Sequence, residues 1–553
     1  MQDDRVARSL ATSARRRLAG CSGTWFCALA IVALFSVLAA RTGSDADWDL
    51  RNYHEYNAHA LISGRFWSDI AAAQLQTFYS PVMDIALGAI RDALNDAPVL
   101  RNVVLSLPQG VAVALAFLLT LRVIPCTLPG RTLLALAAAL WSGVGAAGYP
   151  TLATAMSDAV PGACILAGLL LLTGETMPAA RSTALAGMLF GVAVGLKLTT
   201  APYAIAGTIA LLTAPRRTAS RRLPALATFI LGGTVAAIVL GGPWWLLLYR
   251  HFGNPMLPYL NQVFRSPFVD PLPFTDGRFF PRGITMALAY PFYWAAQPRA
   301  LASELLVRDP RFAIAYVALA SIAVRALRRR LDGRSGNRSA AMLAVFFSGT
   351  FALWEMQFSV LRYLAALELL TGAIVLTALR PWLTRPGIRA PVALAFVALC
   401  VGTQAMTIYP NWGRMAAPLP MRASLPTAVE PDAMVVLLDG APMAYLADLF
   451  PATVRLVGAN NNLVRPGGGN LLARQAAAAI RNHEGPLYGL QDQVESPGTA
   501  DRTLAYYELR RGPCAPVESN LDNNAIQWCR LLPRPRQDDP TVRPQGTMAS
   551  GAR

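Results

Sequence analysis

The residues best suited to chemistry open the stretch 43–70, which begins with three closely spaced aspartates. Asp45, Asp47 and Asp49 follow directly on a long apolar segment. Carboxylates so close to a bilayer surface are costly unless water solvates them or a reaction uses them. A carboxylate placed there can act as a general base and take the proton of an attacking hydroxyl group.

Two elements must position these aspartates, a membrane span before them and a surface helix after them. The apolar run 24–40 is the span, and its end brings the chain to the bilayer surface. The residues from Leu50 onward repeat with helical spacing, and one face carries Leu50, Tyr53, Tyr56 and Ala60. We therefore expect an amphipathic helix on the membrane surface, and Tyr53 and His54 lie on it close to the aspartates.

The composition places the whole chain in a membrane. Of its 553 residues, 54% are hydrophobic and 15% are charged, against about 45–50% and about 25% in soluble proteins. This excludes a soluble enzyme, a disordered scaffold and a secreted disulfide-rich module. We predict a polytopic α-helical protein with about eleven transmembrane helices, near 24–40, 100–121, 132–149, 158–174, 183–196, 199–213, 225–248, 312–327, 339–354, 363–380 and 390–408.

The distribution of charge predicts the orientation in the membrane. The net charge is +17, and the basic residues gather in alternate short segments between the spans. By the positive-inside rule those segments, and the basic tail 1–23, face the cytoplasm. An odd number of spans then places the C-terminal region outside. Because this pattern accounts for the basic residues, we expect no nucleic-acid partner.

Three large pieces are expected on the outer, periplasmic side. Two are loops of the transmembrane module 24–409, and they cover residues 41–99 and 249–311. The third is a small α/β domain over 410–533, followed by a disordered tail over 534–553. The predicted strands of the α/β domain are Met434–Leu438, Val454–Val457 and Thr503–Leu509, and its predicted helix is Asn470–Arg481.

An acidic motif in a large first outer loop, a multi-span body and an outer C-terminal domain resemble the GT-C superfamily of glycosyltransferases. As topology, the resemblance covers roughly residues 20–410. It implies an enzyme of the bacterial inner membrane that moves a sugar from a polyprenyl-phosphate donor to a glycolipid, polysaccharide or protein acceptor. Two alternatives stay open: a transporter or flippase of lipid-linked saccharides, and a non-catalytic component that binds a partner through its outer domain.

The resemblance also implies roles for three acids. Asp49, in Asp47-Trp48-Asp49-Leu50, matches the catalytic base best, and Asp47 is the second choice. Asp158, at the outer end of the fourth span, would assist the first acid or bind a metal, although Asp also favours a helix N-cap. Three hypotheses remain: a Mg or Mn site from Asp49 and Asp158, a site from Asp47, Asp49 and His54, and general-base catalysis without a metal.

Three basic residues are candidates for holding the lipid phosphate. Lys197 is the single lysine among 49 basic residues, and it joins two short spans. Buried near the membrane it would need an anionic partner, such as the phosphate of the donor, unless it extends to the headgroups. Arg362 opens a later span on the outer side and is a second candidate. Arg282, in the middle outer loop, is a third.

The remaining expectations concern single residues. Asn254, in the Gly-Asn-Pro turn of the middle loop, is a candidate contact to lipid or acceptor. Glu368, an intramembrane acid, is a candidate contact to acceptor or donor, unless Arg362 or a polar neighbour satisfies it. Tyr53 and His54 are further candidate contacts to donor or acceptor. Cys514 and Cys529 lie 15 residues apart in the polar C-terminal region. They would form a disulfide if that region faces an oxidising compartment.

Overall fold

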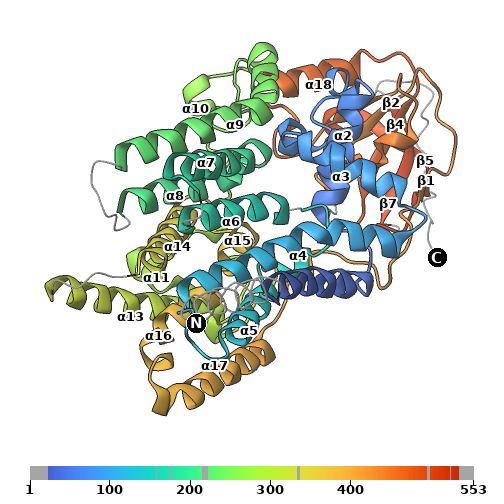
Figure 1. The fold of residues 1–553 in the computed structure, drawn as a ribbon. Coiled ribbons are helices and arrows are strands. Elements are labelled where there is room, and N and C mark those ends of the chain that lie inside the picture. The colour runs from blue at the N-terminus through green and yellow to red at the C-terminus, as the bar shows by residue number, and fades with distance from the viewer. Residues whose placement is uncertain are drawn as a thin grey trace, which may run out of the picture. The chain divides into compact units, whose positions relative to one another are not determined.

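The computed structural model describes residues 23–156, 158–174, 177–213, 222–332, 337–494, 498–522 and 525–534 (Figure 1). The predicted cytoplasmic tail 1–23 and disordered tail 534–553 lie outside these residues except for Gly23 and Arg534. The chain divides into two compact units. The first comprises Met1–Ala58, Phe78–Ser266 and Pro271–Met421, and the second comprises His59–Thr77, Pro267–Asp270 and Arg422–Arg553.

The first unit is built from helices that can cross a membrane. Within the described ranges six helices are long and apolar enough, and a bent pair gives a seventh span if it is counted as one. The chain is therefore a multi-pass helical membrane protein. The six helices are Gly23–Ala40, α4 (Pro98–Val123), α7 (Ala179–Leu196), α9 (Arg222–Phe252), α14 (Arg338–Gln357) and α17 (Pro386–Met406).

The predicted number of about eleven spans is larger than this count. Every predicted segment contains a helix, but several of these helices are short or charged. Helices α5 (Arg131–Gly143), α6 (Ala159–Thr173) and α8 (Ala201–Thr213) have 13 to 15 residues, and a span needs about 20. Helix α13 (Arg311–Leu331) carries arginines in its last turn. The predicted span 363–380 is broken, since Leu361–Glu368 and α16 (Thr371–Leu383) meet at a 46° bend.

Shorter elements connect these helices. The predicted surface helix is present as a π-helical turn η1 (Leu50–His54) followed by α2 (Glu55–Ile62), and its four apolar positions are buried. The other short helices are α3 (Val82–Ala93), α10 (Asn261–Phe264), α11 (Ile284–Leu288), α12 (Tyr290–Ala296) and α15 (Ala365–Glu368).

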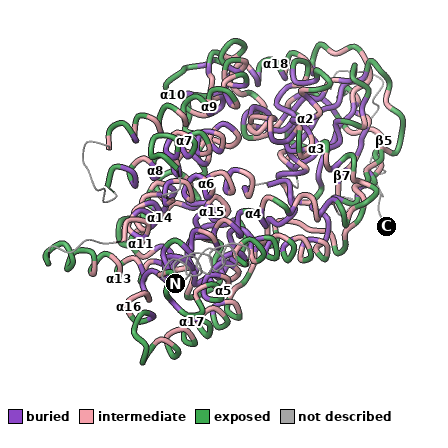
Figure 2. The backbone as a smooth tube through the Cα atoms, in the orientation of Figure 1, coloured by how far each residue is buried: buried purple, intermediate pink, exposed green. Residues whose placement is uncertain are grey.

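Two spans expose most of their apolar surface, as helices facing lipid do. In α17 only Phe396 and Thr403 are buried, and α9 is also mostly exposed or half-buried along its length (Figure 2). Their exposed residues include leucine, isoleucine and valine. In water such surfaces would be unfavourable, whereas the hydrocarbon region of a bilayer solvates them.

Helices α7 and α9 approach each other closely because glycines line their contact. Gly187, Gly191 and Gly195 repeat every four residues and so share one face of α7. A Cβ atom at Gly187 would lie 2.0 Å from the carbonyl oxygen of Phe229, and one at Gly191 would lie 2.0 Å from that of Gly233. Small residues at this spacing are the usual way in which membrane helices pack backbone to backbone.

The second unit contains a five-stranded mixed sheet with the strand order β3-β2-β4-β7-β5. Strands β3, β2 and β4 are parallel, and β7 is antiparallel to both β4 and β5. Every residue of β2 is buried, as expected for a central parallel strand covered on both faces. The strands are β2 (Met434–Leu437), β3 (Arg455–Gly458), β4 (Leu487–Asp492), β5 (Leu509–Pro516) and β7 (Ile526–Pro533), and β1 (Ala423–Ser424) pairs with β6 (Glu518–Ser519).

Two predicted strands and the predicted helix of this unit are confirmed by β2, β3 and α18 (Leu471–Arg481), which Asn470 caps. The predicted strand Thr503–Leu509 is wrong. Most of it belongs to helix α19 (Thr499–Tyr506), and β5 begins at Leu509. The helix forms because Ala500, Thr503 and Leu504 are buried together at helical spacing.

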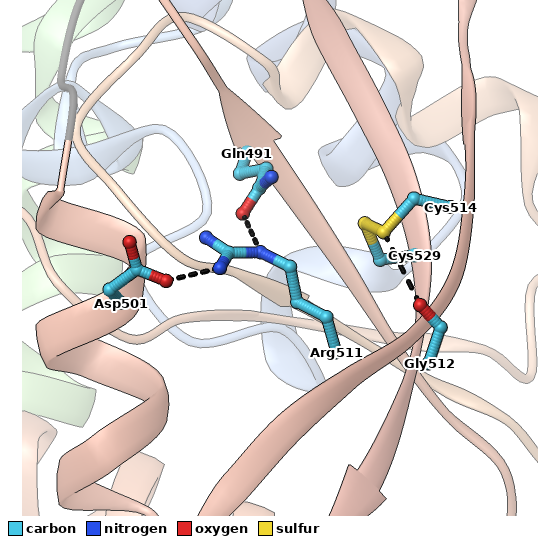
Figure 3. The surroundings of a disulfide bond; sticks show 6 residues. All are labelled: Gln491, Asp501, Arg511, Gly512, Cys514 and Cys529. Carbon is cyan, nitrogen blue, oxygen red and sulfur yellow. Dashed lines mark hydrogen bonds and ion pairs between the residues drawn. A yellow bond between two sulfur atoms is a disulfide. The ribbon is translucent and has the colours of Figure 1, made fainter. Parts of the chain in front are cut away.

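A disulfide joins β5 to β7 in this unit. Cys514 and Cys529 are directly opposed in the antiparallel register and are bonded to each other. Figure 3 shows the bond beside Arg511, which donates to Gln491 and to Asp501 of α19. The cross-link closes a loop that includes the short strand β6.

Candidate active site

The loop after the first span holds its aspartates in three different environments. Asp45 is buried and accepts hydrogen bonds from the backbone of Ala155 at 2.6 Å and of Asp47 at 3.1 Å. Its carboxylate therefore ties the loop to the segment before α6. This anchoring role was not predicted, although Asp45 stands in the same acidic run.

Asp47 lies just before the π-helical turn, and one of its carboxyl oxygens has no partner among the described residues. Its Oδ1 accepts from the backbone N–H of Leu50 at 2.7 Å, which satisfies a donor at the helix start. Its Oδ2 is buried and has no hydrogen-bond partner among the described residues. Burial raises the pKa of Asp47 well above its ordinary value, and the nearby carboxylates of Asp45 and Asp49 add to the shift.

Asp49 forms an ion pair with a residue far away in sequence. Its Oδ2 lies 2.8 Å from Nη1 of Arg362, and the Tyr53 hydroxyl donates to the same oxygen at 3.4 Å. Two predicted residues, the candidate base and a candidate phosphate ligand, are thus direct partners. Nε of Arg362 is buried and has no acceptor within the part of the chain that is described.

Asp158 and Lys197 form a second pair of the same kind. Nζ of Lys197 lies 2.5 Å from Oδ1 of Asp158 and donates to the backbone oxygen of Met156 at 3.0 Å. Asp158 occupies the N-cap position of α6, but its side chain makes no capping bond. The N-cap alternative therefore describes its position and not its contacts.

The two pairs meet on two residues that the sequence did not single out. Met156 receives Lys197 at its backbone oxygen and lies 3.6 Å from Nη1 of Arg362 through its Sδ atom. Tyr363 lies under both cations, with its ring centre 5.6 Å from Nζ of Lys197 and 5.4 Å from the guanidinium carbon of Arg362. We call Asp49, Arg362, Asp158 and Lys197 the charged cluster.

Tyrosines extend the cluster on one side. The rings of Tyr53 and Tyr79 meet edge to face at 5.5 Å, and Tyr79 stacks on Tyr259 at 6.0 Å. The hydroxyls of Tyr79 and Tyr259 lie 2.5 Å apart. Burial raises the pKa of both, so they stay neutral hydrogen-bonding groups. The surplus of aromatic residues in the two outer loops was the available sequence signal.

Three other predicted residues lie outside the charged cluster. His54 is buried and pairs with Asp84 at 2.6 Å. Asn254 is fully buried within its own turn, where it donates to the carbonyl of Tyr259 and accepts from the backbone of Met256. Arg282 is exposed, and its backbone N–H contacts Met286. The contact roles predicted for these side chains stay predictions.

Glu368 belongs to a separate network. Its two carboxyl oxygens accept from the backbone of Ala147 and Gly148, each at 3.0 Å. Asp309 accepts from the neighbouring Ala146 and pairs with Arg311 at 2.8 Å. We call Asp309, Arg311 and Glu368 the Arg311 network. It fixes the loop that leads from α5 to Tyr149.

A cavity of about 450 Å³ lies in the first unit beside Asp47. One wall is the loop from Tyr149 to Met156, and another is the segment that follows α17. Its lining comprises Thr42, Asp47, Tyr149, Pro150, Thr154, Met156 and residues 409–416. Met156 thus contacts both the cavity and the charged cluster.

The contacts of the acids argue against the predicted Mg or Mn sites. Asp49 and Asp158 are each paired with a cation, and His54 is paired with Asp84. Over the described ranges, no three histidine, cysteine, aspartate or glutamate side chains gather into a possible metal site. The donor set fits ion pairing better than metal binding.

The fold is similar to that of a solved membrane enzyme. ArnT from Cupriavidus metallidurans, in a crystal structure bound to undecaprenyl phosphate, matches with a TM-score of 0.50 and 12% identity over 92% of this chain and 98% of that one. The fold of the chain is therefore GT-C-like. No protein-family model and no curated protein matches the sequence.

Two further solved GT-C structures match less closely. The apo state of the same ArnT has a TM-score of 0.48 and 12% identity, covering 92% of this chain and 98% of that one. The apo oligosaccharyltransferase of Archaeoglobus fulgidus has a TM-score of 0.41 and 11% identity, and the match covers 90% of this chain and 74% of that one. At these identities the similarity concerns the fold alone.

Proposed function

We propose that this protein is an integral membrane glycosyltransferase of the bacterial inner membrane. It would move a sugar from a polyprenyl-phosphate donor to a glycolipid, polysaccharide or protein acceptor at the outer face. The observation that carries the proposal is the charged cluster, in which two carboxylates and two cations meet around Met156 and Tyr363.

The proposed reaction needs both kinds of charge. The acceptor hydroxyl oxygen forms a bond to the anomeric carbon of the donor sugar, and the bond from that carbon to the phosphate oxygen breaks. Polyprenyl phosphate leaves with the bonding electrons. The hydroxyl proton passes to Asp49, the general base, which returns it to solvent. Arg362 and Lys197 stabilise the negative charge that grows on the leaving phosphate.

The ion pairs give the cluster a stable state before the donor binds. A lone buried cation would be strongly destabilising, and each carboxylate removes that cost. A donor phosphate can then replace the carboxylate beside each cation. Arg362 has the capacity for it, because its Nε has no acceptor among the described residues and guanidinium groups bind phosphate through two N–H groups. Its movement would free Asp49 to act as the base.

The assisting acids take smaller roles in this proposal. Asp158 holds Lys197 in place until the phosphate arrives, at a pair distance of 2.5 Å. Asp47 borders the cavity and the start of the helix that carries Tyr53. The ArnT structure that shares the fold contains undecaprenyl phosphate, which supports a polyprenyl phosphate as the lipid part of the donor.

The decisive experiment compares donor binding with donor turnover in nanodiscs. The probes are radiolabelled polyprenyl-phosphate sugars, offered to the wild type, Asp49→Asn and Lys197→Met. We expect release of polyprenyl phosphate by the wild type and a loss of about 10²- to 10⁴-fold in Asp49→Asn with binding retained, as for removal of a general base. Lys197→Met should weaken binding itself.

The matched control is Asp276→Asn, which breaks a solvent-exposed pair with Arg278 and should leave both readouts unchanged. Donor binding without release in every protein would favour a transporter or flippase. No binding of any donor would favour the partner-binding component. Either result would overturn the proposed enzyme.

The proposed orientation has its own test in Cys126. This free cysteine is exposed in the loop between α4 and α5, a segment that the charge pattern assigns to the cytoplasm. A membrane-impermeant thiol reagent should label it only after the cells are permeabilised. Labelling in intact spheroplasts would reverse the proposed topology, including the periplasmic placement of the C-terminal unit.

A further inference from the structure

The cavity beside Asp47 has the size and lining of a site for a small polar molecule. Its volume of about 450 Å³ lies within the range of about 300–1,000 Å³ that is usual for such sites. Three aromatic side chains, Tyr149, Tyr409 and Trp412, contribute to its lining. The ring centres of Tyr149 and Tyr409 lie 5.5 Å apart, so the two rings contact each other. Aromatic side chains can pack against the apolar face of a ring in a bound ligand.

Three polar groups of the lining can accept a hydrogen bond from a ligand. Asp47 is only 1% exposed, and its Oδ2 atom has no hydrogen-bond partner in the described part of the chain. The hydroxyls of Thr42 and Thr154 donate to backbone oxygens at 2.8 and 3.0 Å. Their free lone pairs therefore remain available to a ligand that donates hydrogen bonds.

The charge of the lining favours a neutral ligand. Arg414 lines the cavity, but its Nη1 and Nη2 atoms donate to the backbone oxygens of Gly43, Pro150 and Leu152. A phosphate or carboxylate would find no unused guanidinium fork there and would meet Asp47. An ammonium group would meet the positive charge of Arg414. Hydroxyl groups satisfy the acceptors without either conflict.

The position of the cavity links it to the charged cluster. Met156 lines the cavity and also bonds Lys197 through its backbone oxygen, and its Sδ atom contacts Arg362. Met156 therefore contacts both the cavity and the two cations. A second substrate at a transfer site must lie close to the first, and this cavity borders the residue that the cations contact.

We propose that this cavity binds a neutral, hydroxyl-bearing sugar ring of the acceptor, with Oδ2 of Asp47 accepting from a ring hydroxyl and Trp412 packing against the ring. This inference rests on the proposed function and narrows its acceptor to a glycan. Asp47 is in this view a binding residue for the acceptor, whereas Asp49 acts on the proton.

The test measures acceptor binding and donor turnover separately in nanodiscs. The acceptor probes are the methyl glycosides of glucose, galactose, mannose and N-acetylglucosamine, followed by saturation-transfer NMR. The variants are Asp47→Asn, which keeps the shape of the side chain, and Trp412→Ala, at a partly exposed position. The control is Trp67→Ala, because Trp67 is 50% exposed and lies in the second unit.

We expect the wild type and Trp67→Ala to bind at least one of the four glycosides. Both cavity variants should bind it about tenfold or more weakly, since each loses a contact worth roughly 1.4 kcal/mol or more. With turnover, they should raise the acceptor KM while donor binding stays unchanged. Equal binding by the variants, or no binding of any glycoside by the wild type, would overturn the inference.

A failure of the proposed function gives a different result. In that case no polyprenyl phosphate is released by the wild type, whatever the glycosides do. Release of polyprenyl phosphate together with unchanged glycoside binding in both cavity variants would retain the enzyme and reject the acceptor site. The two readouts therefore separate the two claims.

Discussion

The two groups of buried charges in the first unit differ in how completely their polar atoms are bonded. In the Arg311 network all five guanidinium N–H donors have acceptors, which are Trp141, Val144, Gln404, Thr407 and Asp309. In the charged cluster and beside it, Nε of Arg362 and Oδ2 of Asp158 and Asp47 have no partner among the described residues. Both groups are largely enclosed, so burial alone does not distinguish them.

This difference in hydrogen bonding indicates a structural role for one group and a ligand-binding role for the other. A fully bonded network fixes one arrangement of the chain, and here it holds the loop before Tyr149. An incompletely bonded one retains donors and acceptors that a ligand can use, and native proteins rarely leave such groups without a reason. We therefore assign ligand binding to the charged cluster and its surroundings, where polar atoms are unused, and a structural role to the Arg311 network.

The largest expected effect on stability comes from replacing the central arginine of each group by methionine. Arg311→Met removes five hydrogen bonds and leaves Asp309 buried without its cation, with only backbone donors such as Ala146 still bonded to it. We expect a loss of about 3–5 kcal/mol in the free energy of unfolding. Arg362→Met removes one ion pair while Tyr53 still donates to Asp49, so we expect about 1.5–3 kcal/mol and a loss of donor binding. Thermal unfolding in detergent measures the stabilities. Equal losses would remove the distinction between the groups.

A medium effect is expected where the Arg311 network leaves no space. A Cβ atom at Gly145 would lie 2.1 Å from the carboxyl carbon of Glu368. Gly145→Ala should therefore destabilise the protein by about 1–3 kcal/mol, as overpacking does. The control is Gly402→Ala in α17, where nothing lies within 4 Å and the helix should gain slightly. Similar changes in melting temperature would contradict the rigid loop.

A smaller effect tests why this chain retains one lysine. Lys197 reaches Asp158, Met156 and Tyr363 with a compact ammonium group. Lys197→Arg keeps the charge but replaces it by a planar fork with different geometry. We expect donor affinity to fall about tenfold, or roughly 1.4 kcal/mol, in an equilibrium binding assay. Arg278→Lys, at an exposed pair, serves as the control. An unchanged affinity for the donor would mean that an arginine at position 197 binds the donor as well as the lysine does.

The smallest effect is expected from removal of divalent metal. Because the carboxylates of Asp49 and Asp158 face cations, treatment with EDTA should change the rate of sugar transfer less than about twofold. The measurement is turnover before and after chelation. A large loss that Mg²⁺ or Mn²⁺ restores would show that the acids bind a metal in place of the ion pairs that they form in the structure.

Local pattern was sufficient for most elements of the fold. Apolar runs predicted the helices, and short apolar strands predicted β2 and β3. The strand predicted over 503–509 is wrong, and the span predicted over 363–380 is broken by a bend. Length and composition do not show where a helix bends. A short segment with several apolar residues can form a strand or a helix, and its packing against neighbouring elements decides which.

The sequence by itself determined which charges stand next to the membrane: the aspartates after the first span, the single lysine, and Arg362 at the start of a later helix. Only the tertiary structure decided that Asp49 meets Arg362, that Asp158 meets Lys197, and that Glu368 serves a loop instead. Periodicity records which face of an element is apolar, because that depends on neighbours in the chain. Ion pairing depends on distances of a few ångströms between remote segments, and packing alone sets these.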